Sequence, residues 1–79
     1  MLPERSRGGF TVQVYRYLTG PDDAAFCHRV TAALNNGWLL FGPPTLTFDS
    51  KIGRVICGQA ITKDVPDRTY SPDMDLSSV

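Results

Sequence analysis

The sequence predicts an α+β domain with the element order β-α-β-β, in which one helix packs on one face of a three-stranded sheet. Apolar and polar side chains alternate in residues 10–18, which is typical of a strand, and residues 26–34 show the apolar spacing of a helix. Two further alternating segments flank a turn at residues 49–53, as in a hairpin. A chain of 79 residues is long enough for one such domain.

The first strand is predicted to begin at Phe10 and to end at Leu18. Its aliphatic face contains Phe10, Val12, Val14 and Leu18. The opposite face carries Tyr15 and Tyr17, so both faces of this strand bear bulky side chains.

A helix is predicted from about Pro21 to Asn36. Thr19 and Asp22 have the spacing of a capping box at its start, where Pro21 fits the first turn. At the other end, Gly37 is expected to adopt a positive φ and to stop the helix. The face toward the sheet is expected to contain Phe26, Val30, Ala33 and Leu34.

The remaining segments predict two strands joined by a hairpin. The first comprises residues 38–48 and is interrupted at residues 42–44, because neither Pro43 nor Pro44 can donate a hydrogen bond to a sheet. The last strand is predicted at residues 54–62. A right-handed crossover makes the first two strands parallel, and the third strand then returns between them. The helix covers one face of this sheet, and nothing in the chain is expected to cover the other.

The domain is expected to span residues 10–63. A flexible arm is expected at residues 1–9, and a disordered acidic tail at residues 64–79. The tail carries four aspartates against one arginine, together with two prolines.

The composition argues against two classes of partner. Eight Lys and Arg residues balance eight Asp and Glu residues, whereas nucleic-acid-binding proteins usually carry a basic excess, so nucleic acid is not an expected partner. No apolar run approaches the roughly 18 residues of a membrane span, and the first residues lack the apolar segment of a signal peptide. We therefore expect a cytoplasmic protein without a membrane partner.

No constellation of residues predicts catalysis, a metal site or a cofactor. Cys27 and His28 are neighbours whose side chains point about 100° apart on a helix, which separates thiol from imidazole. Two cysteines and one histidine at these spacings do not form a zinc site. Cys27 and Cys57 are interpreted as two buried thiols, with a disulfide or redox pair as the alternative. We expect that the protein is not an enzyme.

A resemblance to a known family is carried by five segments in order: residues 15–23 (YRYLTGPDD), 26–30 (FCHRV), 34–38 (LNNGW), 42–45 (GPPT) and 57–60 (CGQA). Together they resemble the bacterial and phage domain-of-unknown-function family 1737. The likeness covers roughly residues 14–63, which is essentially the whole predicted fold. It implies a small stand-alone domain and no particular activity, because the family is defined without one.

One candidate functional site is a ligand site near the predicted start of the helix. Free N–H groups and the helix dipole favour an anion at such a position. The interruption at Pro43 is expected at the same end of the sheet, and two basic side chains could approach it. The candidate residues are Thr19, Gly20, Pro43, Lys51 and Arg54. An anionic small molecule, such as a nucleotide, would be bound or sequestered there.

The other candidate is the uncovered sheet face, whose aromatic side chains we expect to become buried by self-association. The expected interface residues are Tyr15, Tyr17 and Trp38. The sequence therefore predicts a small interaction or assembly domain that forms a homodimer or a higher even oligomer. Binding of an anionic ligand remains the alternative function.

Overall fold

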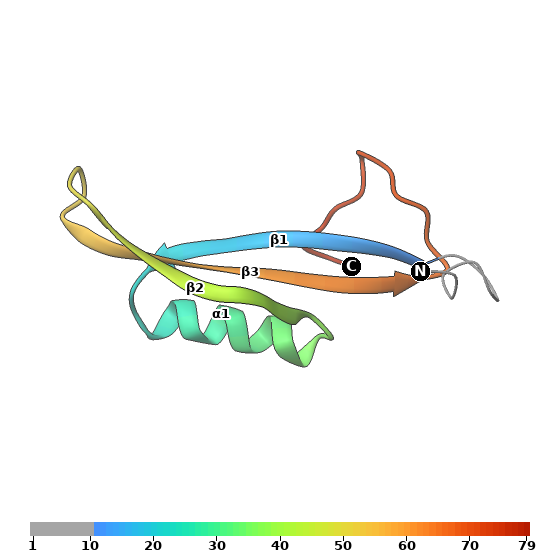
Figure 1. Ribbon diagram of the computed structural model, residues 1–79, viewed down its shortest axis with the longest axis horizontal. Coiled ribbons are helices and arrows are strands. Elements are labelled where there is room, and N and C mark those ends of the chain that lie inside the picture. Colours follow the sequence, from blue (N-terminus) through green and yellow to red (C-terminus); the bar gives the residue numbers. More distant parts are fainter. Residues whose placement is uncertain (1–10) are drawn as a thin grey trace.

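The computed structural model describes residues 11–79 and contains a three-stranded sheet with one helix on one of its faces (Figure 1). Its elements in chain order are β1 (Thr11–Pro21), α1 (Ala24–Asn35), β2 (Leu39–Asp49) and β3 (Arg54–Pro66). The strand order is β1-β3-β2, and β3 runs antiparallel to both neighbours. The predicted fold class, element order and topology are confirmed. Phe10 and the predicted arm at residues 1–9 lie outside the described residues.

The pairing of β1 with β3 is long and unbroken. It runs from Thr11 opposite Pro66 to Pro21 opposite Ile56, so both strands extend beyond the segments that alternation predicts. Residues 64–66, which the sequence assigns to the tail, are therefore the end of β3. That boundary of the predicted domain is wrong.

The start of α1 also differs from the prediction. Gly20 pairs with Cys57 and keeps the backbone extended through Pro21, so the helix begins only at Ala24. Asp23 is the N-cap, and its side chain accepts a hydrogen bond from the Phe26 N–H at 3.1 Å. The predicted capping box at Thr19 is wrong, because residues 19–21 are paired with β3 as part of β1.

The end of the helix agrees with the prediction. Gly37 has φ +93°, the left-handed conformation that glycine adopts at least cost. Its N–H donates to the Leu34 carbonyl at 3.2 Å and the Trp38 N–H donates to the Ala33 carbonyl at 3.1 Å, which satisfies the last turn. The chain then enters β2 directly.

The predicted interruption in β2 is a bulge within a single strand. Phe41 pairs with Ala60 and Thr45 pairs with Gly58, so the bulged strand has two more residues than β3 over the same stretch. Gly42 has φ +75° within this bulge, and its carbonyl accepts a hydrogen bond from Nε2 of the buried Gln59 at 3.1 Å. Phe41 before the bulge and Thr45 after it therefore lie on the same face of the sheet.

The core lies between α1 and the sheet. Its buried apolar residues are Val14, Leu18, Ala33, Trp38 and Ile61, with Phe26 and Val30 partly buried against them. Leu34, which the helical spacing places in the core, is 40% exposed, so that assignment is wrong. Ala33 is the buried residue of α1 and packs in the core. Leu34 lies on the side of α1 that also carries Val30 and Thr31, which line a shallow groove beside β2.

The C-terminal segment lies on the helix side of the sheet. Met74, Leu76 and Val79 pack against the core, and Nζ of Lys63 donates to the Val79 carbonyl at 3.0 Å. Figure 1 shows this segment, in red, looping back beside β1 and β3 at the end far from the β2–β3 hairpin. It thereby covers apolar residues that α1 does not reach. Within residues 11–79, no helix has the length and apolar character needed to cross a membrane.

Candidate functional site

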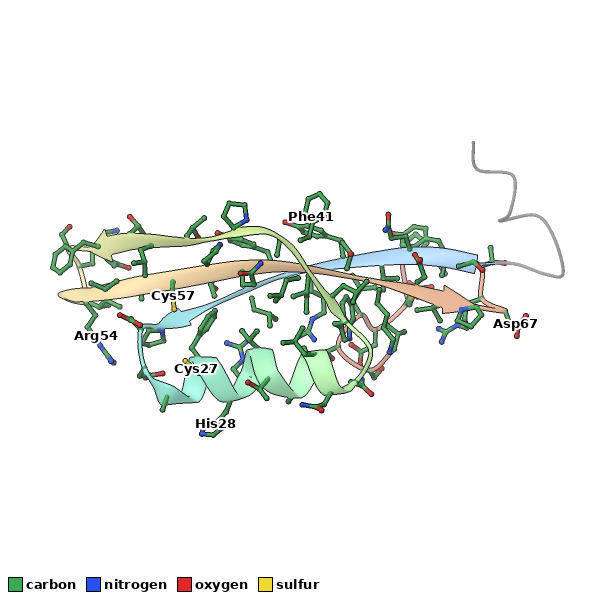
Figure 2. The ribbon with its side chains drawn as sticks, turned by 60° about the horizontal axis from the view of Figure 1, so that its bottom comes forward. Cys27, His28, Phe41, Arg54, Cys57 and Asp67 are labelled. Atoms are coloured by element: carbon green, nitrogen blue, oxygen red, sulfur yellow. The ribbon has the colours of Figure 1, made fainter. Side chains whose placement is uncertain are left out.

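The face of the sheet opposite to α1 carries large side chains on its outer strands and small residues on its central strand, and we call this surface the trough. Ala60 in the central strand lies between Tyr17 of β1 and Phe41 of β2. One step along the strands, Thr62 lies between Tyr15 and Leu39. We define the trough by these six residues: its walls are Tyr15, Tyr17, Leu39 and Phe41, and its floor is Ala60 and Thr62. Figure 2 shows Phe41 on the side of the sheet away from α1.

The walls of the trough are apolar and exposed. The exposed fractions are 52% for Tyr15, 48% for Tyr17, 67% for Leu39 and 62% for Phe41. The floor is only partly exposed. The large side chains of the two outer strands therefore give this face an exposed apolar surface.

Tyr17 is held in place by contacts across the sheet. Its hydroxyl forms a 2.6 Å hydrogen bond with the Thr45 hydroxyl of β2, and the ring passes over Gly58 of β3. A Cβ atom at position 58 would lie 2.5 Å from Oη of Tyr17 and 2.9 Å from Oγ1 of Thr45. Gly58 is thus the residue that allows this aromatic wall to lean over the central strand. The small residues Gly58 and Ala60 on one face of β3 were the sequence signal for it.

Trp38 does not belong to this face. Its side chain is 2% exposed in the core, with the Arg16 guanidinium 5.6 Å and the Lys63 ammonium 5.9 Å from the ring centroid. The prediction that Trp38 is an interface residue is therefore wrong. Trp38 comes directly before β2 rather than within it, so the alternation of side chains along β2 did not predict which face of the sheet Trp38 would lie on.

The structure does not bring the predicted ligand residues together. Pro43 lies in the β2 bulge, whereas Arg54 pairs with Asp49 beside the hairpin turn that contains Lys51. Nη2 of Arg54 lies 3.8 Å from Oδ2 of Asp23, the helix N-cap, so its charge already faces a carboxylate. The bulge does not reach the end of the sheet at which α1 starts, because β2 continues past the prolines.

Thr19 and Gly20 attach α1 to β1. The Thr19 carbonyl accepts a hydrogen bond from Nη1 of Arg29 at 2.8 Å, and the Gly20 carbonyl accepts one from the Cys57 thiol at 3.5 Å. A Cβ atom at Gly20 would lie 3.2 Å from the Phe26 ring. Both positions are therefore used in helix–sheet packing.

The thiols are separate and differ in environment. Cys57 is buried and Cys27 is exposed, and both are free, so the interpretation of two buried thiols is wrong for Cys27. Desolvation, and then the nearby Asp22 carboxylate, raise the pKa of the Cys57 thiol. In Figure 2, His28 points away from the sheet. Among the residues that the structure describes, no three His, Cys, Asp or Glu side chains gather as a metal site.

The fold and this face define a class of small α+β domain, in which one helix covers one side of a three-stranded sheet and an apolar trough lies on the other. The chain belongs to the family described as Domain of unknown function (DUF1737), which matches residues 12–64. The match runs from β1 almost to the end of β3, and it confirms the resemblance inferred from the sequence. No curated protein and no solved structure matches the chain.

Proposed function

We propose that the protein is a non-enzymatic assembly domain that pairs with a second copy of itself through the trough. The observation that carries this proposal is the exposure of four large apolar side chains around a floor of small residues. Water contact with such a surface is unfavourable by about 25 cal/mol per Å² of apolar area. A partner that covers the trough removes this cost.

We expect a second copy to cover the trough through the same residues. In a two-fold arrangement, the Leu39 and Phe41 wall of one copy enters the trough of the other above Ala60 and Thr62, and the reciprocal contact forms at the same time. The same patch thus supplies both ridge and groove. Tyr17 would then lie at the interface, where its ring offers apolar area and its hydroxyl remains bonded to Thr45.

The size of the patch also suits such a pair. A large side chain offers roughly 150–250 Å² when fully exposed, so four that are about half to two thirds exposed present on the order of 400 Å². This is about half of the roughly 800 Å² that each partner buries in a standard interface. Polar neighbours on the same face, such as Gln13 and Thr47, would supply the rest.

Pairing through the edge of β2 fits the structure less well. An exposed apolar edge strand can recruit another strand, but Pro43 and Pro44 lack the N–H groups that such a ladder requires. The bulge also interrupts the regular spacing of the strand in its middle. These features favour packing of faces over extension of the sheet.

Two matched substitutions test the proposal by sedimentation velocity. Phe41 and Phe48 lie on the same strand and are 62% and 63% exposed. Phe48 comes three positions after Thr45, which shares the face of Phe41, so Phe48 faces the helix side. We expect the parent chain to be a dimer at micromolar concentration. Phe41→Lys should make it monomeric, because it buries a charge in the interface, and Phe48→Lys should leave it dimeric. A monomeric parent chain, or equal effects of the two substitutions, would refute the proposal.

A further inference from the structure

We propose that a pocket between β1 and α1 binds a small oxyanion, namely the phosphate or carboxylate group of a metabolite smaller than a nucleotide. The pocket has a volume of about 260 Å³ and lies on the helix side of the sheet, away from the trough. Arg16 of β1, Arg29 and Asn36 of α1, Trp38 and Ser77 are among the residues that line it. The inference is independent of the proposed self-association.

The charge of the pocket is positive. Two guanidinium groups line it, and none of its lining residues is Asp or Glu. Within residues 11–79, the one pair of opposite charges in ion-pair contact is Arg54 with Asp23, so no carboxylate of these residues is in direct ion-pair contact with Arg16 or Arg29. An anion would therefore meet two guanidinium groups inside a concave surface that is partly shielded from water.

Both arginines are held in position by the fold. Nη1 of Arg29 donates to the Thr19 carbonyl at 2.8 Å, which leaves its other N–H groups available. The Arg16 guanidinium lies over the Trp38 ring at 5.6 Å from the centroid, a cation–π contact that restrains its position. A guanidinium presents two parallel donors that match a carboxylate or phosphate. Because both groups are already positioned, little conformational entropy is lost when an anion binds.

The remaining polar groups suit the same ligand. Asn36 and Ser77 also line the pocket, and the side-chain amide of Asn36 can donate hydrogen bonds to an anion. The pocket volume is about 260 Å³. This is slightly below the roughly 300–1,000 Å³ of pockets for drug-sized ligands, so a small metabolite fits better than a nucleotide.

Asp75 in the C-terminal segment places a carboxylate beside Ser77, one of the residues that line this pocket. Hydrogen bonds from Ser77, and to a smaller extent the charge of Arg16, lower the pKa of the Asp75 carboxyl group. It is therefore ionised at neutral pH, and its Oδ1 accepts the Ser77 hydroxyl at 2.7 Å rather than a guanidinium. A negative charge at this place opposes an incoming anion. Its removal by Asp75→Asn should strengthen binding.

Trp38 provides the readout, because it is the one tryptophan of the chain and lines the pocket. The probes are inorganic phosphate and succinate, titrated separately at constant ionic strength while tryptophan fluorescence is recorded. We expect a saturable change with at least one probe. Saturation by phosphate alone, by succinate alone or by both identifies a phosphate group, a carboxylate group or any oxyanion as the ligand. The absence of saturation with both probes would overturn the proposal.

Three variants connect the response to the pocket. Arg29→Gln should weaken binding at least tenfold, whereas Lys51→Gln, which removes an equal charge in the distant hairpin turn, should change the affinity less than twofold. Asp75→Asn should tighten binding several-fold. A similar affinity in all three variants would overturn the proposal. If Arg29→Gln lowers the thermal midpoint by many degrees, its affinity is not interpretable, and Asp75→Asn becomes the deciding variant. An unchanged affinity of Asp75→Asn for the probe would then overturn the proposal.

Discussion

Substitution of Gly58 by alanine tests how the trough is built. The new methyl group would lie 2.5 Å from Oη and 2.7 Å from Cζ of Tyr17, which is closer than non-bonded atoms approach. The backbone of β3 is paired on both sides and cannot move away, whereas the half-exposed Tyr17 ring can swing toward solvent. The expected result is displacement of Tyr17 with little change elsewhere.

The free-energy cost follows from what Tyr17 loses. Its hydrogen bond with the Thr45 hydroxyl is worth about 0.5–1.5 kcal/mol, and loss of part of its packing on the sheet adds about as much. We therefore expect Gly58→Ala to lower the free energy of unfolding by about 1–2 kcal/mol. Urea denaturation monitored by circular dichroism at one fixed protein concentration measures this change.

A double-mutant cycle identifies the cause. In a Tyr17→Leu background the aromatic ring is absent and only the 2.9 Å contact with Oγ1 of Thr45 remains, so Gly58→Ala should cost less than in the parent chain, and the two substitutions should couple by about 1 kcal/mol. An equal cost of Gly58→Ala in both backgrounds would show that the clash lies elsewhere. A cost near zero in the parent chain would show that Tyr17 does not lean over the central strand.

Three further predictions concern the helix and the C-terminal segment, each measured by thermal or urea unfolding. Leu34→Ala should cost less than about 1 kcal/mol, because the side chain is 40% exposed; a cost of about 2–5 kcal/mol would place it in the core. Gly37→Val should cost at least about 1–2 kcal/mol, since a β-branched residue resists φ +93°; an unchanged midpoint would contradict this helix end. Removal of residues 74–79 exposes apolar core contacts and should lower the thermal midpoint by at least about 4 °C, whereas an unchanged midpoint would show that the segment does not dock.

Much of the fold follows from periodicity in the sequence. Alternation defines β1 and β3, the spacing of Phe26 and Val30 defines the helix, and Gly37 marks its end. The crossover rule then gives the strand order. These features depend on neighbouring residues or on the order of the elements along the chain, and both can be inferred from the sequence.

The errors arise where tertiary contacts decide. Thr19 has the chemistry of a cap, but its segment pairs with β3 for longer than alternation shows, so Asp23 caps the helix instead. Leu34 is the larger side chain, yet the rotation of α1 turns Ala33 toward the sheet. Trp38 is buried partly by residues far along the chain, which no local pattern reveals.

The basic pocket was missed although the sequence contains a signal for it. Arg16 follows Val12 and Val14 at the same period, so it interrupts the aliphatic face of β1 with a charge. A charged residue on the face that meets the core needs a partner or a role there. Its partners, the Trp38 ring and the pocket beside Arg29, come from other elements and are visible only in the folded chain.

The most direct test of the assembly proposal is an intermolecular contact measured in solution. A sample that mixes isotope-labelled and unlabelled chains allows nuclear Overhauser effects between two copies to be observed separately from those within one copy. The account predicts an effect between the Ala60 methyl group of one copy and the Phe41 ring of the other, since these lie on the floor and the wall of the trough. Intermolecular effects that involve only the Phe48 side of the sheet, or none at millimolar concentration, would contradict it.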